Sequence, residues 1–325
     1  MITSDLCPIA SKAYKDIVGQ TSVLRQLDFY IQSYIKTRIV PHLILVAPKG
    51  CGKTTIARAT AKALQKVNSE KKGKYVSCAG FGKATVEQFY TQLVAPNMVD
   101  QDVTFIFDEC HNLSSAIQEE LLSILNPNPR QLNITTFEGQ DYEFNFTRLT
   151  FVFATTEPHM MKEALMDRLT RIELEEYELH HLAKIVNNNL AGYKVSKQVL
   201  EKISSTLRGN ARSAQKTSDE IARYLQQKSK KTLTIQDWKT LCNILNIHPL
   251  GLNKTEVNIL RVLSHVSHMR LTQLSSVTGV NRNALQKDIE TYLQKKRLIS
   301  IETKGRSITG FGITYLREVD KLKQK

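Results

Sequence analysis

Long apolar runs and paired cysteines are both missing from this sequence, and each absence excludes a class of protein. No apolar stretch approaches the roughly 18 residues that a membrane-spanning helix needs. The five cysteines are scattered without a C-x-x-C pair, which argues against a zinc site or a disulfide framework. The first residues lack the basic-then-apolar pattern of a secretory signal, so we expect a cytoplasmic protein with reduced thiols.

Acidic residues are few relative to basic ones, and the imbalance is concentrated at the C-terminal end. The chain has 45 Lys and Arg against 31 Asp and Glu, a net charge of +14. From residue 253 onward 14 basic residues stand against 6 acidic ones, so +8 of this charge lies in the last 73 residues. Such a local excess is typical of a nucleic-acid-binding surface. We therefore expect a polyanionic partner.

Three blocks with different patterns follow one another along the chain. Residues 1–174 alternate short apolar runs with helical stretches, which predicts an α/β domain with a parallel five-stranded sheet. Residues 175–250 show only helical periodicity and predict an all-α lid domain. Residues 251–325 show three helical patterns and two β runs, 298–302 and 307–313, typical of a winged-helix domain. The predicted sheet strands are residues 42–47, 74–78, 103–107, 149–154 and 170–174.

One interruption of the first block predicts a β-hairpin at about residues 132–146. Residues 133–137 and 142–146 are two short β patterns around a polar turn. In the second, apolar side chains at 142, 144 and 146 alternate with polar ones. The hairpin either covers the edge of the sheet or docks a partner, and the pattern leaves both open.

Residues 47–54 have the context of a P-loop, because they follow a predicted strand and open a predicted helix. Their sequence is Ala-Pro-Lys-Gly-Cys-Gly-Lys-Thr, with Ala47 in place of the usual first glycine. Backbone N–H groups of such a loop cradle phosphate oxygens at a helix N-terminus. Lys53 is expected to reach the terminal phosphates of ATP, and the Thr54 hydroxyl to ligate Mg²⁺. The residues of the loop predicted to bind nucleotide are Gly50, Cys51, Gly52, Lys53, Thr54 and Thr55.

Two acidic residues end the apolar run 103–107 in the manner of a Walker B motif. Asp108 is expected to orient the Mg²⁺ shell, and Glu109 to polarise the attacking water. The next apolar strand ends in Thr155 and Thr156, where a polar side chain can hold that water beside the γ-phosphate. These acids and hydroxyls therefore predict ATP hydrolysis as well as ATP binding.

Taken together, these motifs resemble the AAA+ superfamily and, more narrowly, the RuvB-type motors that drive Holliday-junction branch migration. Residues 14–20, Tyr-Lys-Asp-Ile-Val-Gly-Gln, resemble the segment of the family that lines the adenine pocket. Residues 108–113, Asp-Glu-Cys-His-Asn-Leu, resemble the Asp-Glu-Ile-His-Arg-Leu of the family, and residues 154–156, Ala-Thr-Thr, match its sensor 1 strand. The resemblance extends from about residue 14 to residue 316.

The resemblance implies roles for residues that the motifs alone leave open. It places Ile17 and Val18 in the adenine pocket and makes Thr156 the sensor 1 residue. It also places Tyr177 near the base. Two arginines gain a role as well, because the resemblance implies that Arg168 is an arginine finger donated to a neighbouring subunit. Arg212 is implied to reach the γ-phosphate of its own subunit from the lid.

The resemblance also implies partners. It implies a homo-oligomer, a hexameric ring around duplex DNA, and a RuvA-like junction-binding protein docked on the hairpin. The hairpin sequence Thr-Phe-Glu-Gly-Gln-Asp-Tyr at 136–142 differs from the glycine-rich sequence of the family. Met166 stands two residues before Arg168, where the family commonly has an arginine.

The basic C-terminal block supplies the residues that we predict to contact DNA. The helix expected at 282–293 presents Arg282 and Lys287 on the side opposite its apolar stripe. Lys304 and Arg306 belong to the basic turn between the two β runs, the wing tip, from which we expect Arg306 to enter a minor groove. A translocating motor favours phosphate contacts over base contacts, so we expect little sequence preference.

The sequence thus predicts an ATP-dependent motor that translocates duplex DNA through an oligomeric ring and drives branch migration at four-way junctions. Two alternatives stay open at this point. One is another AAA+ DNA machine of the initiator or clamp-loader type. The other is a non-catalytic protein that uses ATP as a switch for assembly on DNA, against which Glu109 and Arg168 argue.

Overall fold

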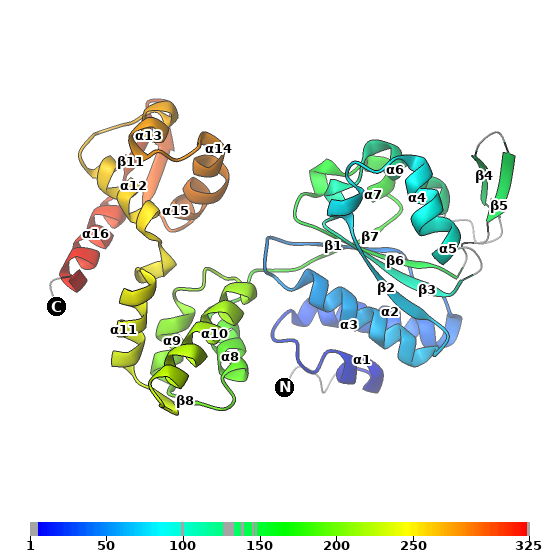
Figure 1. Cartoon of the computed structure of the whole chain (residues 1–325), viewed down its shortest axis with the longest axis horizontal. Helices are drawn as coiled ribbons and strands as arrows, with labels where there is room; N and C mark the ends of the chain where they lie inside the picture. Colours follow the sequence, from blue (N-terminus) through cyan, green and yellow to red (C-terminus); the bar gives the residue numbers. More distant parts are fainter. Residues whose placement is uncertain are drawn as a thin grey trace. The chain divides into compact units, whose positions relative to one another are not determined.

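The computed structural model describes residues 6–98, 101–125, 133–137, 140–144, 146 and 148–323. They form two compact units, Met1–Ile185 with Gly209–Ser213, and Val186–Arg208 with Ala214–Lys325 (Figure 1). The division into three domains at residues 174 and 250 stays a prediction. Among the described residues, no helix has the length and apolar character that crossing a membrane requires.

A parallel sheet of five strands, in the order β2-β3-β6-β1-β7, forms the centre of the first unit. All five predicted strands are confirmed. The central strands β3 and β6 are apolar and buried almost throughout, as strands covered on both faces must be. Because all strands run in one direction, their carboxyl ends meet at one edge. The strands are β1 (Leu43–Val46), β2 (Lys72–Ser77), β3 (Val103–Asp108), β6 (Thr150–Thr155) and β7 (Thr170–Glu173).

Helices cover both faces of this sheet and create two apolar cores (Figure 1). On one face α1 (Pro8–Ala13), α2 (Thr21–Thr37) and α3 (Lys53–Val67) pack against alternate strand residues such as Leu45 and Val152. On the other face, phenylalanines of β3 and β6 stack in a ladder, with Phe107 and Phe153 ring centroids 5.2 Å apart. The elements around this second core are η2 (Cys78–Phe81), α4 (Val86–Phe89), η3 (Tyr90–Val94), α5 (Ala95–Asn97), η4 (Cys110–Asn112), α6 (Ser115–Ile124), η5 (Pro158–Met160) and α7 (Glu163–Met166).

The predicted hairpin is present as a separate two-stranded antiparallel sheet (Figure 1). Its strands are β4 (Asn133–Phe137) and β5 (Gln140–Phe144), so the second strand begins two residues earlier than predicted. Phe146 was expected on the apolar face of the hairpin, but it follows the strand and is buried in the core beside β6. The turn at 138–139 lies outside the described residues. Whether a partner docks on the hairpin is not tested by these contacts.

The helical part of the second unit confirms the all-α prediction apart from one very short strand pair. Residues Lys194–Val195 (β8) and Thr232–Leu233 (β9) pair in parallel between helices. The helix α8 (Leu179–Asn189) crosses the boundary between the two units, and α10 (Ala211–Gln227) does so near its N-terminus. The remaining helices of this part are α9 (Lys197–Ser204) and α11 (Ile235–Leu245).

The C-terminal part is a winged helix, but its second β run is shorter than predicted. The strand β11 ends at Ile308, and residues 310–313 begin α16 (Gly310–Lys323). The Thr309 hydroxyl accepts a hydrogen bond from the Gly312 N–H (3.1 Å) at the start of this helix, and a side chain at 312 would meet the Leu298 carbonyl. The other elements are η6 (Pro249–Gly251), α12 (Lys254–Ser264), α13 (Leu271–Thr278), α14 (Arg282–Ala284), the π-helical η7 (Leu285–Glu290), α15 (Thr291–Lys295) and β10 (Ile299–Glu302).

One arginine ties the winged helix to the helical bundle within the second unit. Arg208 Nη1 donates to Glu256 Oε1 (2.9 Å) at the start of α12, and its Nε donates to the Gly251 carbonyl (3.0 Å). Its guanidinium also lies over the Tyr292 ring, 4.2 Å from the centroid. Glu256 is only 2% exposed, so this carboxylate depends on Arg208 as its charged partner.

Candidate ATP-hydrolysis site

The P-loop connects β1 to α3 at the carboxyl edge of the sheet. Gly50 and Gly52 have φ angles of +78° and +90°, which glycine adopts without the steric cost of a Cβ. Lys53 is 7% exposed, and its Nζ donates to the carbonyls of Ala47 (2.7 Å) and Pro48 (3.0 Å). The loop therefore holds the lysine ammonium against its own backbone, at the N-terminus of a helix.

Opposing influences act on the Lys53 ammonium. Burial lowers the pKa of Lys53, and the negative charges of Glu109 and Asp108 counteract that effect. Arg212 lowers this pKa as well, so its guanidinium lies within electrostatic range of Lys53. The structure thus brings Lys53 together with the two acidic residues after β3 and with Arg212, although these three parts of the site are far apart in the sequence. This is the charge arrangement that a triphosphate requires.

Asp108 is the meeting point of three segments. Its Oδ2 accepts hydrogen bonds from the Thr54 hydroxyl (2.8 Å) and from the Tyr75 hydroxyl (2.9 Å), and its Oδ1 accepts from the Glu109 N–H (3.1 Å). The approach of Thr54 to Asp108 is the one that the two motifs predicted. Tyr75 was missed, because an aromatic residue in an edge strand carries no sequence signal for a polar role. The Arg58 guanidinium lies over the Tyr75 ring, 4.4 Å from the centroid.

The segment before Arg212 is fastened to the P-loop. Asn210 Oδ1 accepts from the N–H groups of Arg212 (2.9 Å) and Ser213 (3.1 Å), as a helix N-cap does, while its Nδ2 donates to the Lys49 carbonyl (3.2 Å). The Ala211 N–H donates to the Gly50 carbonyl (3.0 Å). Asn210 was also missed, although an asparagine just before a predicted helix is a recognisable capping signal.

The predicted adenine-pocket residues lie in the segment that precedes α2. Val18 is buried, and Ile17 packs against the core beneath the sheet. Next to them Gln20 bridges the backbone of Glu175, donating from Nε2 to its carbonyl (2.6 Å) and accepting from its N–H (3.2 Å). This bridge joins the first segment of the chain to the segment that follows β7.

Tyr177 lies over the P-loop. Its hydroxyl oxygen is 2.9 Å from the position that a Cβ would take at Gly52, so a side chain at 52 would displace it. The Tyr177 N–H donates to the Gly209 carbonyl (3.1 Å), and burial raises the pKa of its phenol to about 12. Tyr177 therefore sits between the loop and the lid segment, where the resemblance implied a residue near the base.

Thr155 and Thr156 differ in their surroundings at the end of β6. Thr155 is fully buried, and its hydroxyl accepts from the Glu157 N–H (3.0 Å) and lies 3.1 Å from His111 Nδ1. Thr156 follows the last residue of the strand and is partly exposed. The role of Thr156 in holding water stays a prediction. The contact between Thr155 and His111 was not predicted.

Arg168 lies on the surface between α7 and β7. Its side chain is exposed, and Nη1 donates to the Ala164 carbonyl (2.8 Å) one helical turn earlier. An arginine presented to a neighbouring subunit must be accessible in this way. Its action on a neighbour stays a prediction.

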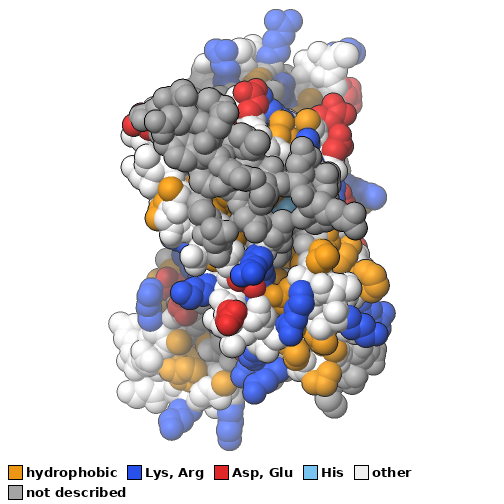
Figure 2. All heavy atoms as spheres, turned by 90° about the vertical axis from the view of Figure 1, so that its right-hand side faces the viewer, with side chains coloured by type: hydrophobic (Ala, Val, Ile, Leu, Met, Phe, Trp, Pro, Cys, Tyr) orange, Lys and Arg blue, Asp and Glu red, His pale blue; other side chains and the backbone are white. Residues whose placement is uncertain are grey.

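The predicted DNA-binding residues divide into two groups. Arg282, Lys287 and Lys304 are exposed, and the opposite stripe of the helix is buried through Leu285 and Leu293. These three exposed cations of the winged helix remain candidates for DNA contact. On the face of the chain drawn as spheres in Figure 2, Lys and Arg side chains are dispersed among hydrophobic, acidic and neutral ones.

Arg306 has a different environment from the one expected. It lies in β11, not in the wing turn, and its Nε and Nη2 donate to the two carboxylate oxygens of Glu290 (2.8 and 3.0 Å). The side chains are 14% and 3% exposed, so the pair is shielded from water. Its guanidinium is therefore engaged within the fold. The contact with a minor groove is not tested, but the geometry does not favour it.

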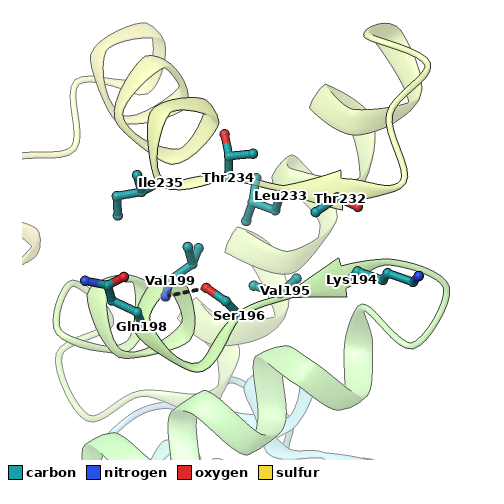
Figure 3. Close-up of a pocket in the computed structure, with 9 residues that line it drawn as sticks. All are labelled: Lys194, Val195, Ser196, Gln198, Val199, Thr232, Leu233, Thr234 and Ile235. Carbon is teal, nitrogen blue, oxygen red and sulfur yellow. Dashed lines mark hydrogen bonds between the residues drawn. The ribbon is translucent and has the colours of Figure 1, made fainter.

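A separate pocket lies in the second unit and contains none of the predicted site residues. It encloses about 480 Å³ between β8, β9 and the first turns of α9 and α11 (Figure 3). Ser196 Oγ accepts from the Val199 N–H (3.4 Å) there, which caps α9 (Figure 3). Ser196 and Thr234 serve there as the N-caps of α9 and α11, so the ATP chemistry is assigned to the sheet edge and not to this pocket.

Comparison with known families agrees with this geometry. Residues 9–174, which are 166 of the 325 residues, match the family described as the Holliday junction DNA helicase RuvB P-loop domain. The chain belongs to the RuvB family. Residues 249–317 also match the RuvB C-terminal winged helix domain.

Individual RuvB proteins resemble the chain along nearly its whole length. The branch migration complex subunit RuvB of Ehrlichia ruminantium (strain Gardel) is 28% identical over 311 residues, covering 93% of this chain and 90% of the relative. That of Campylobacter hominis is 26% identical over 324 residues, covering 96% and 91%. The solved structure of Thermotoga maritima RuvB, described as a Holliday junction branch migration motor, superposes with a TM-score of 0.75 over 95% of this chain and 98% of that one. At 21% identity this last likeness shows the fold alone.

Membership of the RuvB family confirms two predictions. The architecture of a P-loop α/β domain, a helical lid and a winged helix is that of the family. The chain is a nucleotide-binding AAA+ ATPase, and it is therefore an ATP hydrolase.

Proposed function

We propose that this chain is an ATP-driven motor that translocates duplex DNA through an oligomeric ring and drives branch migration at four-way junctions. The observation that carries the proposal is the convergence of Lys53, Thr54, Asp108 and Arg212 at one edge of the sheet. The RuvB family models describe a P-loop domain and a C-terminal winged helix, and the present chain matches both. A cytoplasmic location and a three-domain division at residues 174 and 250 are part of the proposal.

The chain's own residues divide the hydrolysis between them. The P-loop N–H groups and Lys53 bind the phosphates, and Arg212 adds a second positive charge from the lid segment. Glu109 takes a proton from the attacking water, and Thr156 orients that water. Tyr177, Ile17 and Val18 form the wall against the base. Preorganised charge of this kind supplies most of the rate enhancement in phosphoryl transfer.

Thr54 and Asp108 form a set of ligands that suits Mg²⁺. Their hydroxyl and carboxylate oxygens lie 2.8 Å apart, and oxygen donors of this kind are what Mg²⁺ prefers. When bound, the ion neutralises charge that develops on the phosphates. Thr54 and Asp108 would hold it, directly or through water.

Arg168 makes the site dependent on a neighbour. An exposed arginine beyond α7 completes the ATP site of the next subunit in a ring, which couples hydrolysis to assembly. We place six subunits in that ring, and we assign the hairpin of β4 and β5 as the docking site of a RuvA-like protein. The DNA contacts are Arg282, Lys287 and Lys304, which bind phosphates. Arg306 is left out, because Glu290 already engages its guanidinium.

The first test is steady-state ATP hydrolysis without DNA, with linear duplex and with a synthetic four-way junction. We expect hydrolysis to rise with duplex and further with the junction, and to vanish in Arg168→Ala. Hydrolysis that ignores DNA would overturn the motor proposal in favour of a loader or a switch.

A mixing experiment tests the action of Arg168 in trans. Arg168→Ala and Glu109→Gln subunits are each expected to be inactive alone. In a mixed ring, a Glu109→Gln subunit supplies its intact Arg168 to a neighbour whose Glu109 is intact, so hydrolysis is expected to return. Continued inactivity of mixtures that co-assemble, as measured by size-exclusion chromatography, would show that Arg168 acts elsewhere.

A further inference from the structure

The side chain of Glu109 contacts His111, a residue of the Asp-Glu-Cys-His-Asn-Leu segment to which the sequence assigns no role. His111 Nε2 lies 3.3 Å from Glu109 Oε2, and its Nδ1 lies 3.1 Å from the Thr155 hydroxyl. The imidazole is 12% exposed, whereas Glu109 is 42% exposed. The ring therefore forms a shielded bridge between the end of β6 and the carboxylate that follows β3.

The backbone of Glu109 is already fixed at both ends. Its N–H donates to Asp108 Oδ1 (3.1 Å), and its carbonyl accepts from the N–H and the side-chain amide of Asn112 (3.0 and 3.1 Å). Its φ of +56° is a left-handed conformation that is sterically unfavourable for a non-glycine residue. Strain of this kind persists where the surroundings fix the conformation, and it gathers at functional sites. What remains to be set is the rotamer of the carboxylate.

The chemistry of the three groups gives the bridge a direction. His111 Nε2 faces Glu109 Oε2 at 3.3 Å and Asn112 Nδ2 at 3.5 Å. Because an ionised carboxylate only accepts hydrogen bonds, the shorter contact, with Glu109, is made with a proton on Nε2. In a neutral imidazole Nδ1 is then an acceptor, and the Thr155 hydroxyl donates to it. The same hydroxyl accepts from the Glu157 N–H, which orients it. Hydrogen bonds are therefore donated in one direction, from the Thr155 hydroxyl to His111 and from His111 to the Glu109 carboxylate.

We propose that His111 is a positioning residue that sets the rotamer of Glu109 and ties it to the end of β6. The residue after Thr155 is Thr156, the proposed holder of the attacking water. The bridge thus fixes the base and the water holder relative to one another. The inference rests on the proposed role of Glu109 as the base, and it adds a residue that acts through Glu109.

Three substitutions of His111 separate its two hydrogen bonds. Glutamine places an amide near Nε2 and can still donate to Glu109, while asparagine replaces only the function of Nδ1. Phenylalanine keeps the ring volume without either bond. We expect kcat to fall about 10-fold or more in His111→Phe, since a misplaced catalytic group costs up to about 100-fold in rate. Glutamine should recover more activity than asparagine, and the affinity for ATP should stay unchanged in all three.

Two further variants control for nonspecific effects. His159 lies 3.9 Å from Glu157 with the same two-residue separation, but it is 73% exposed, so His159→Gln should leave kcat unaltered. Thr155→Val removes the hydroxyl at nearly constant volume. Its effect and that of His111→Phe should combine to less than their sum, because both break one bridge.

The histidine ring itself gives a readout that is independent of hydrolysis. In ¹⁵N-histidine-labelled protein, the signals lost in His111→Gln identify His111, and they should show the tautomer with the proton on Nε2. Glu109→Ala and Thr155→Val should each shift these signals and leave those of His159 in place. An Nδ1-protonated tautomer, or signals that neither variant moves, would overturn the proposal.

The outcomes distinguish this inference from the proposed function. If His111→Phe hydrolyses ATP at the normal rate while Glu109→Gln does not, the base is correct and the positioning role is wrong. If Glu109→Gln also hydrolyses normally, the proposed function fails instead. Should the phenylalanine variant not fold, the order of glutamine and asparagine decides, and equal rates in those two would overturn the proposal.

Discussion

Arg306 is an example of a basic residue whose guanidinium is engaged by one acidic neighbour, Glu290, within the fold. Sequence placed Arg306 and Lys304 together on a basic turn, but strand pairing points Arg306 to the buried carboxylate of Glu290. Lys304 stays exposed two residues away. A buried carboxylate that loses its only bidentate partner keeps its desolvation cost, so the two cations should respond differently to removal.

We expect Arg306→Ala to destabilise the second unit by about 3 kcal/mol, because Glu290 is left buried and unpaired. Replacing both partners, Arg306→Met with Glu290→Leu, should restore most of that stability. Lys304→Ala should leave unfolding unchanged and reduce the slope of log K against log salt for DNA binding by about 1. Chemical denaturation and DNA titrations at several salt concentrations measure these effects. Equal stability of Arg306→Ala and Lys304→Ala would contradict the structural role.

His42 provides a second residue-scale prediction, on pH. Burial, together with the charge of Lys71, lowers the pKa of His42 from 6.5 to about 4, and its Nδ1 accepts from the Phe151 N–H (3.2 Å). The unfolded chain takes up this proton near pH 6.5, whereas the folded chain resists until about pH 4. Stability should therefore fall by up to about 3 kcal/mol as pH drops through this window. Urea titrations of His42→Asn, which keeps an acceptor, should show a shallower pH dependence than the parent chain.

At the scale of elements, burial made the strands predictable and left their connections harder to read. Strands β1, β3 and β6 are covered on both faces, so apolar runs marked them closely. The start of α16 was mistaken for strand, because Phe311 and Ile313 fit a β pattern, while Gly312 between them allows the helix to pack closely on the Leu298 carbonyl. Motifs marked the residues that we predict to bind nucleotide. They assigned no role to Tyr75, Asn210 or His111, because the contacts of these side chains with Asp108, Lys49 and Thr155 arise from tertiary placement.

The N-terminus of α10 carries a prediction at this scale. Asn210 caps the helix that bears Arg212 and also holds the Lys49 carbonyl. Asn210→Ala should cost about 1 kcal/mol of stability as a lost cap, and it should weaken ATP binding several-fold. Asn210→Asp keeps the cap but not the donor to Lys49, so its stability should be near normal while its ATP affinity is reduced. Titration with a fluorescent ATP analogue checks this, and equal affinity in both variants and the parent would contradict it.

At the scale of the whole molecule, a motor must transmit the state of its ATP site to the part that holds DNA. Within the second unit, Arg208 is the residue that fastens the winged helix to the helical bundle, through Gly251, Glu256 and Tyr292. Because this attachment uses one guanidinium on a nearly buried carboxylate, it is sensitive to a single substitution.

We expect Arg208→Met to leave ATP hydrolysis without DNA near normal and to reduce its stimulation by duplex DNA. The reason is that a loosened winged helix still binds phosphates but no longer moves with the bundle. Limited proteolysis should cut Arg208→Met faster than the parent chain near residues 246–253. Full DNA stimulation together with unchanged proteolysis would show that the attachment lies elsewhere.

The grouping of residues 209–213 with the first unit has a consequence for dissecting the chain. The polypeptide passes from one unit to the other at 185, returns at 208 and leaves again at 213, so no single cut separates the two. A gene fragment that stops at 185 encodes the P-loop and Glu109 but omits Asn210 and Arg212. Fragments designed on the linear order of motifs would thus yield an ATPase domain without one of its own arginines. To regain Asn210 and Arg212, such a fragment must carry residues 209–213 as an added peptide or loop.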